Sequence, residues 1–283
     1  MKKIAVYGKG GIGKSTITGA LSAACADMGL RVMQIGCDPK ADSCINLLGG
    51  HAITPVMELL RSGKQNVKLD DIVKEGYKGV LCTEAGGPMP GLGCAGRGIL
   101  TTFELLEELD AFEHYKPDVV FYDVLGDVVC GGFAAPIREG YAEDVVIVTS
   151  GEKMALFAAN NICSAVGQFA DREYARVKGV ILNRRNVRRE EELVKEFAEK
   201  WKIPVLGDIP RENLFQQCED ECKTIIEGAP ECEAAKRPKT CNSTAPTGMK
   251  RQNGYGKLHG SVWRDRKRKT SGAGRPRRFS GIY

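Results

Sequence analysis

Residues 2–16 read KKIAVYGKGGIGKST, a short apolar run that leads directly into a glycine-rich loop. The apolar run is typical of a buried parallel strand, and the loop fits the P-loop pattern. In such a loop the glycines let backbone N–H groups surround phosphate oxygens, Lys14 reaches the β- and γ-phosphates, and the Ser15 hydroxyl coordinates Mg2+ at the start of a helix. The sequence therefore predicts that ATP and Mg2+ are bound by Gly8, Lys9, Gly10, Gly11, Ile12, Gly13, Lys14, Ser15 and Thr16.

Strand-like and helix-like segments alternate along the rest of the chain. After the strand at 2–7, strands are expected at 31–36, 119–122, 145–149, 177–182 and 204–206. Helices are expected at 14–28, 99–109, 153–169 and 189–201. This alternation predicts an α/β fold of the P-loop NTPase type, with a mostly parallel sheet covered by helices on both faces. Ligands of such sheets bind at the carboxyl ends of the strands, so the loops after the first three strands should lie side by side.

Charge is distributed unevenly along the 283 residues, although the net charge is only +5. Residues 236–283 hold 14 Lys or Arg and one acid, whereas residues 1–235 hold 27 basic and 35 acidic side chains. The periodic pattern stops near Pro238, and the composition beyond it is typical of disorder. We expect a folded domain over 1–235 and a basic, disordered tail over 236–283. Because charge runs are usually solvated, a nucleic-acid or membrane partner is not expected for this tail.

The cellular compartment is indicated by the apolar runs and by the cysteines. No apolar run approaches the roughly 18 residues that span a bilayer, and the apolar part of the N-terminus is too short for a signal peptide. The chain has 11 cysteines, an odd number with irregular spacing, which does not indicate a disulfide framework. A cytoplasmic protein is expected, in which cysteines are buried, catalytic or bound to metal.

Acidic residues follow the second and third predicted strands. Asp123 ends an apolar strand, where a Walker B acid holds a Mg2+-bound water. Asp38, Asp42 and Asp127 are candidates to position or activate the attacking water, and the sequence does not distinguish among them. Gly126 would allow its segment to move when the γ-phosphate leaves. The predicted catalytic residues are therefore Lys9, Lys14, Asp38, Asp42, Asp123 and Asp127.

Two cysteines have unusually small neighbours. Cys94 lies in GLGCAGRG and Cys130 in DVVCGGF. Small neighbours let backbone N–H groups approach the sulfurs of an iron–sulfur cluster. The alternative is that both cysteines are buried core residues that pack beside glycines and bind no cluster, which would give the same sequence pattern. A 4Fe–4S cluster needs four thiolates, and a two-fold dimer would present this pair twice. Cys130 follows Asp123 by only seven residues, so nucleotide state and cluster position could be coupled.

Five motifs together resemble the iron protein (dinitrogenase reductase) family of nitrogenase and its relatives. They are YGKGGIGKST, GCDPKADS, GCAGRG, FYDVLGDVVCGGFA and AANNI, and the resemblance covers about residues 2–228. Lys9 also resembles the signature lysine of the deviant Walker A ATPases, which contacts phosphate across a dimer interface.

The resemblance implies a homodimer in which Cys94 and Cys130 of both copies hold one 4Fe–4S cluster. It implies that Asn183 contacts the adenine, and that Arg97 docks on the partner and is ADP-ribosylated in some members. The implied reaction is ATP-driven delivery of single electrons to a larger metalloprotein, with a ferredoxin or flavodoxin as the upstream donor.

Some segments depart from the nitrogenase pattern. Cys44-Ile45-Asn46 replaces the usual continuation of DPKADS. The segment GDIPRE at 207–212 is more like nitrogenase-like relatives, which reduce tetrapyrroles or other substrates. The final substrate therefore stays open. The alternative class is a non-redox deviant Walker A ATPase, either a partitioning or positioning protein or a metal-cluster assembly carrier. Partitioning ATPases do not need the two cysteines, and carriers typically have a CxxC motif, which this chain lacks.

Overall fold

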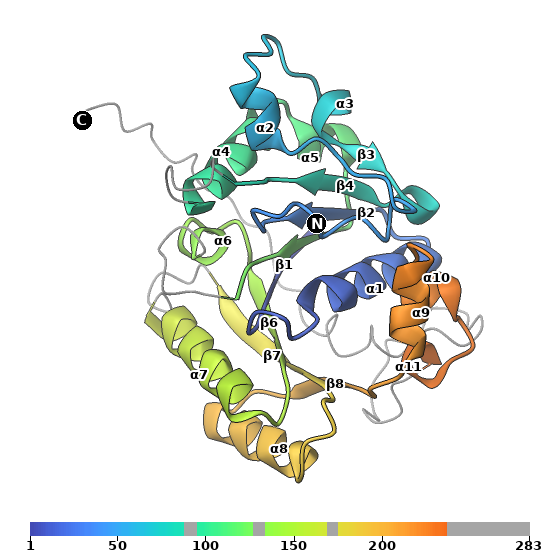
Figure 1. Ribbon diagram of the computed structural model, residues 1–283. Coiled ribbons are helices and arrows are strands. Elements are labelled where there is room, and N and C mark those ends of the chain that lie inside the picture. The colour runs from blue at the N-terminus through green and yellow to red at the C-terminus, as the bar shows by residue number, and fades with distance from the viewer. Residues whose placement is uncertain (88–94, 127–133, 169–174, 237–283) are drawn as a thin grey trace, which may run out of the picture.

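The computed structural model describes residues 1–87, 95–126, 134–168 and 175–236 (Figure 1). The described strands form one eight-stranded sheet in the order β3-β4-β2-β5-β1-β6-β7-β8. All neighbouring strands are parallel except β3 and β4. Their bounds are β1 Lys2–Tyr7, β2 Val32–Gly36, β3 Lys74–Glu75, β4 Leu81–Glu84, β5 Val119–Asp123, β6 Asp144–Thr149, β7 Arg176–Asn183 and β8 Val205–Ile209.

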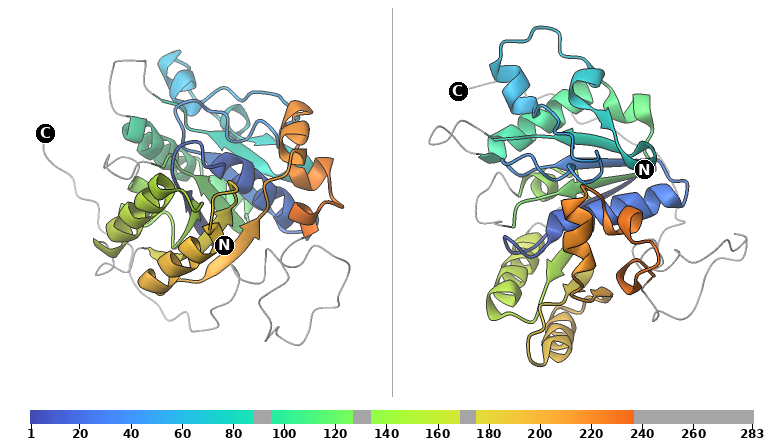
Figure 2. Two further views of the ribbon diagram at one scale, coloured as in Figure 1. Left: turned by 60° about the horizontal axis from the view of Figure 1, so that its bottom comes forward. Right: turned by 45° about the vertical axis from the view of Figure 1, so that its right-hand side comes forward.

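Helices cover both faces of this sheet (Figures 1 and 2). The α-helices are α1 Lys14–Asp27, α2 Val56–Arg61, α3 Leu69–Ile72, α4 Ala95–Glu108, α5 Ala111–Tyr115, α6 Ala135–Arg138, α7 Lys153–Gln168, α8 Glu190–Trp201, α9 Leu214–Asp220, α10 Ile225–Gly228 and α11 Glu233–Lys236, and a 3-10 helix, η1, spans Tyr77–Gly79.

The central strand β1 shows why both faces are apolar. Ile4 and Val6 pack into a core shared with α1 and α10, whereas Ala5 and Tyr7 pack into a second core with α4, α7 and α8. Because successive side chains of a strand point to opposite faces, a strand buried on both sides must be apolar at every position. The unbroken run of residues 4–7 satisfies this requirement.

The strand register brings the carboxyl ends of four neighbouring strands together at one edge. Val6 of β1 and Gly36 of β2 both align with Asp123 of β5, and Gly36 also aligns with Glu84 of β4. The loops that follow β1, β2 and β5 therefore start next to one another, as the strand rule predicts.

The predicted fold class is confirmed. The predicted strands and helices are present with ends that differ by at most three residues, except that α4, predicted at 99–109, begins four residues earlier at Ala95. Strand β4 is the main difference, because the sequence analysis did not assign a strand at Leu81–Glu84. This strand is fully buried, yet it ends in Thr83 and Glu84, whose polar side chains interrupt the apolar pattern. Burial of a carboxyl group cannot be read from sequence periodicity.

Candidate functional site

The glycine-rich loop adopts backbone conformations that require glycine. Gly11 and Gly13 have φ of +72° and +94°, in the left-handed region that side chains disfavour. At Gly8 a Cβ atom would lie 2.3 Å from the Val148 carbonyl oxygen. The loop ends where α1 begins at Lys14, so the N-terminal N–H groups of a 14-residue helix face the loop.

Lys14 lies inside this loop, whereas Lys9 is more exposed. The Lys14 side chain is buried, and its Nζ donates to the Lys9 carbonyl oxygen at 3.4 Å. Burial lowers the pKa of Lys14, and the charges of Asp123 and Asp38 oppose that shift. No carboxylate of the described residues contacts this ammonium group, which makes it a favourable partner for an anionic ligand such as a phosphate.

Asp123 is buried at the carboxyl end of β5. Its Oδ2 accepts a hydrogen bond from the Ser43 hydroxyl at 2.6 Å, while its Oδ1 has no partner among the described residues. Burial raises the pKa of Asp123, and hydrogen bonds from Ser15 and Ser43 with the charge of Lys14 act in the opposite direction. An unbonded carboxylate oxygen beside the Ser15 hydroxyl fits a Mg2+ ion with its bound water.

Two of the other predicted acids, Asp38 and Asp42, lie in the loop at 38–42. Asp38 is half-buried, and its Oδ1 accepts from the Lys40 backbone N–H at 2.9 Å, whereas Asp42 is exposed. Asp127 lies outside the described residues, but Gly126 before it is described. A Cβ atom at Gly126 would lie 1.8 Å from the Gly8 carbonyl oxygen, so the segment after β5 touches the glycine-rich loop directly.

A pocket of about 300 Å3 opens beside the first turn of α1. Its lining includes Ser15, Thr16, Asp42, Glu219, Lys223 and Ile225. The Thr16 hydroxyl donates to Glu219 Oε1 at 3.2 Å, which connects α1 to α9. The pocket therefore lies between the predicted phosphate site and the C-terminal helices α9 and α10.

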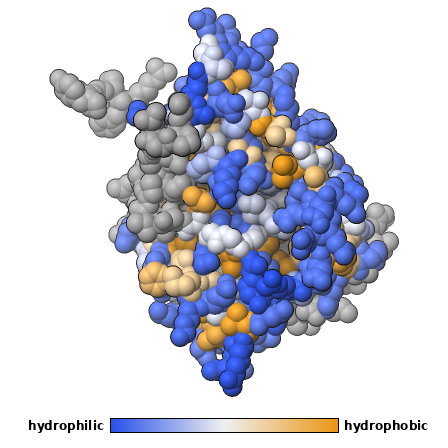
Figure 3. All heavy atoms as spheres, viewed as in Figure 1, coloured by the Kyte–Doolittle hydropathy of each residue, from blue (hydrophilic) through white to orange (hydrophobic). Residues whose placement is uncertain are grey.

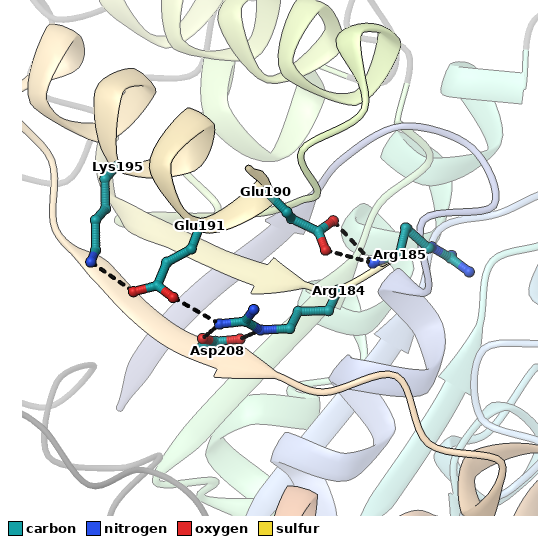
Figure 4. Close-up of polar contacts among 6 residues, drawn as sticks. All are labelled: Arg184, Arg185, Glu190, Glu191, Lys195 and Asp208. Carbon is teal, nitrogen blue, oxygen red and sulfur yellow. Dashed lines mark hydrogen bonds and ion pairs between the residues drawn. The ribbon is translucent and has the colours of Figure 1, made fainter. Parts of the chain in front are cut away.

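The end of β7 and the segment after it donate side-chain hydrogen bonds to the backbone of the glycine-rich loop. Asn183 Nδ2 donates to the Ile12 carbonyl oxygen at 2.7 Å, and Arg185 Nη2 donates to the Gly11 carbonyl oxygen at 2.6 Å. The buried Glu190 carboxylate accepts from the Arg185 backbone N–H (Figure 4). It also accepts from the Gly151 backbone N–H at 3.1 Å. The sequence analysis did not single out Arg185 or Glu190, since exposed-looking Arg and Glu residues follow one another throughout 184–192.

A charged network fixes the strand that carries Asn183. Arg184 pairs with Asp208 of β8 at 2.7 Å and with Glu191, which also accepts from Lys195 (Figure 4). Because Arg184 Nε and Nη2 both contact the Asp208 carboxylate, the geometry is bidentate. This network ties β7, β8 and α8 together next to Asn183.

The predicted cluster ligands, Cys94 and Cys130, lie outside the described residues. Arg97 is described, and it is exposed in the first turn of α4. Eight cysteines are described and none is in a disulfide bond. Cys25, Cys44 and Cys163 are buried in the core.

Glu84 is a buried acid that the sequence analysis missed. Its side chain is 1% exposed, and its Oε1 accepts from the Cys44 backbone N–H at 2.7 Å. Its Oε2 has no partner among the described residues. Burial raises the pKa of Glu84 to about 8, and the hydrogen bonds from Cys44 oppose the shift.

Glu84 should make the free energy of unfolding depend on pH. The folded state keeps the Glu84 proton up to a pKa of about 8, whereas the unfolded chain loses it near the ordinary value of 4.5. The folded state then binds more protons between these two values, so stability falls as pH rises through this window. Glu84→Gln mimics the neutral acid and should remove this fall, as measured by urea unfolding across the window. Glu75→Gln, an exposed control on β3, should leave the fall in place; parallel profiles for wild type and Glu84→Gln would contradict the assignment.

None of the described helices is long and apolar enough to cross a membrane. The face shown in Figure 3 is mostly hydrophilic, with apolar side chains at the surface over α7. Two of the exposed large apolar side chains, Met154 and Phe157, belong to that helix.

Comparison with known proteins relates this site to one family. The family described as "4Fe-4S iron sulfur cluster binding proteins, NifH/frxC family" matches residues 2–244. The nitrogenase iron protein of Methanospirillum hungatei JF-1 is 55% identical over 234 residues, which cover 82% of this chain and 82% of that protein.

Solved structures with a similar fold include P-loop ATPases of low sequence identity. The cell division ATPase MinD of Pyrococcus furiosus has a TM-score of 0.63 and 22% identity, over 83% of this chain and 94% of that one. A ParA family ATPase from Chlorobium tepidum TLS has a TM-score of 0.62 and 15% identity, over 83% and 95%. Similarity at this identity shows the fold alone, whereas the sequence match shows the family. The chain belongs to the NifH/frxC family of 4Fe-4S iron–sulfur cluster binding proteins.

Proposed function

We propose that this chain is the ATP-hydrolysing reductase component of a nitrogenase-type system, which delivers single electrons to a larger metalloprotein. The observation that carries the proposal is the contact between Gly126 and Gly8, because it joins the glycine-rich loop to the segment that leads from Asp123 to Cys130. A change at the phosphates can therefore move the segment that holds a predicted cluster ligand. Membership of a 4Fe-4S family supports the redox half of the proposal.

Each residue of the site would have its own role in binding and hydrolysing ATP. Lys14 and the N–H groups of residues 8–16 hold the phosphates, and Lys9 contacts phosphate across a dimer interface. Ser15 holds Mg2+, and Asp123 accepts a hydrogen bond from a Mg2+-bound water. When bound, Mg2+ neutralises phosphate charge in the transition state. One of the three acids Asp38, Asp42 and Asp127 positions the attacking water, and Asn183 contacts the adenine.

A homodimer follows from the number of thiolates. Cys94 and Cys130 provide two thiolates per chain, and a 4Fe–4S cluster takes four. The cluster, when bound between two copies, supplies one-electron redox chemistry. Met154 and Phe157 of α7 are 62% and 60% exposed, and an interface between two copies would bury apolar surface of this kind. Arg97 would contact the acceptor, and a ferredoxin or flavodoxin would be the donor in a cytoplasmic setting.

The acceptor is proposed to be a nitrogenase-type metalloprotein, since the M. hungatei relative is a nitrogenase iron protein. Protein purified without oxygen should contain about four irons per dimer, with a broad iron–sulfur absorbance in the visible. Adding MgATP should make this iron more accessible to a chelator, because nucleotide binding moves the segment after Asp123. A colourless protein with full ATPase activity would instead indicate a non-redox ATPase.

A further inference from the structure

Gln34 is a buried polar side chain in the middle of a strand that is otherwise apolar. It lies on β2 between Met33 and Ile35, and all three residues are completely buried. A primary amide in such a place is costly unless its hydrogen-bonding atoms are paired. Its partners therefore show what the residue does.

The amide of Gln34 connects α1 to the loop after β2. Its Nε2 donates to both the carbonyl oxygen and the hydroxyl oxygen of Ser43, each at 3.0 Å, and its Oε1 accepts from the Ser22 hydroxyl at 2.7 Å. A carbonyl oxygen can only accept, so the nitrogen of the amide must face Ser43. The orientation of the amide is thus fixed by its neighbours.

The direction of the next hydrogen bond follows. Because the Ser43 hydroxyl oxygen accepts from Gln34, its proton is free to be donated to Asp123 Oδ2 at 2.6 Å. Ser22, Gln34, Ser43 and Asp123 then form one continuous donor-to-acceptor chain, in which each bond polarises the next. Ser22 belongs to α1, the helix that the glycine-rich loop leads into.

Asp123 holds both ends of the loop at 38–42. At one end the Cys37 backbone N–H donates to the Asp123 carbonyl oxygen at 2.9 Å. At the other end Ser43 donates to the Asp123 carboxylate, and the next residue, Cys44, is held by Glu84 at 2.7 Å. Between these ends Pro39, Lys40 and Asp42 are exposed. The loop therefore has a fixed base and an accessible tip.

We propose that Gln34 is a positioning residue that keeps Ser43 on Asp123, so that a change at the Asp123 carboxylate is transmitted to the acids of the loop at 38–42. The inference rests on the proposed ATP and Mg2+ site, because Asp123 Oδ1 has no partner among the described residues and would accept from the proposed Mg2+-bound water. Gln34 touches neither phosphate nor Mg2+ in this scheme. It acts through Ser43.

Gln34→Leu tests the inference, since leucine is similar in volume and has no hydrogen-bonding atoms. Without nucleotide, backbone amides of residues 40–44 should exchange hydrogen for deuterium about tenfold faster than in wild type. Binding of MgADP, which depends mainly on residues 8–16, should weaken less than twofold, while kcat for ATP hydrolysis should fall about tenfold. A purely structural role would change overall stability without this separation of binding from kcat.

Two further variants keep the test decisive. Thr83→Val changes a fully buried residue of β4 whose hydroxyl has no partner among the described residues, so it should leave exchange and kcat unchanged. Ser43→Ala removes the hydroxyl between Gln34 and Asp123, so the Gln34→Leu/Ser43→Ala double variant should lose little more kcat than either single variant. Losses that simply add would overturn the proposal.

The exchange measurement separates this inference from the proposed function. If exchange at 40–44 is the same in wild type and Gln34→Leu without nucleotide, Gln34 does not hold the loop. If exchange at 40–44 is faster in Gln34→Leu than in wild type but wild type does not bind MgADP, Gln34 holds the loop and the proposed nucleotide site is wrong. The positioning role in catalysis is then wrong as well. Weaker MgADP binding in proportion to kcat would also contradict the positioning role.

Discussion

Lys14→Ala is expected to reduce ATP hydrolysis by at least about 100-fold, because it removes a preorganised positive charge from the site where phosphate charge develops. The Lys14 amine is buried within the glycine-rich loop and donates to the carbonyl oxygen of Lys9 rather than to a carboxylate. Among the described residues, Lys14 therefore has no salt bridge to break before it meets a phosphate. Steady-state ATPase assays and calorimetric titration with MgADP would measure both catalysis and binding.

In the same variant, nucleotide should no longer affect the accessibility of the iron. MgATP should no longer change chelator access to iron in Lys14→Ala, while the amount of iron stays at the wild-type level. Lys64→Ala is a suitable control, since Lys64 is an exposed side chain that pairs with Asp71 of α3 and belongs to none of the contacts described for the site. Wild-type ATPase activity in Lys14→Ala would remove the basis for placing phosphate at this loop.

Cys94→Ala and Cys130→Ala should each abolish cluster binding, so that iron falls from about four atoms per dimer to nearly none. Each substitution removes two of four thiolates, since both copies in the dimer change together. Iron content and the visible absorbance of anaerobically purified protein would measure the loss. Nucleotide binding should persist, because Lys14 and Ser15 are untouched.

Cys163→Ala is the matched control for these two variants. Cys163 is a buried cysteine of α7 packed in the core among apolar residues, so its replacement should leave the iron content unchanged. If Cys94→Ala or Cys130→Ala keeps its full complement of iron, that residue is not a cluster ligand. If Cys163→Ala loses iron as well, the loss reflects folding rather than ligation.

The strands and helices near the phosphate loop were predictable because their signals are local. Gly11 and Gly13 stand where φ is positive, and the apolar run before them fits a strand buried on both faces. Strand β4 was not predictable in the same way. Its Thr83 and Glu84 look like surface residues in the sequence, and only the packing of neighbouring elements makes them fully buried.

The α/β class, the glycine-rich loop, the order of acids after the strands and the family could all be predicted from the amino-acid sequence, since each depends on residues close together in the chain. Tertiary structure alone decided which distant groups meet. It placed Gly126 against Gly8 and put Arg185 on the Gly11 carbonyl oxygen.

The tertiary structure also places the buried amide of Gln34 between Ser22 and Ser43. The physical reason is that a hydrogen bond between residues far apart in the chain depends on strand order and register. A buried polar residue looks the same in sequence as an exposed one, so its partners become visible only when the strands are placed side by side.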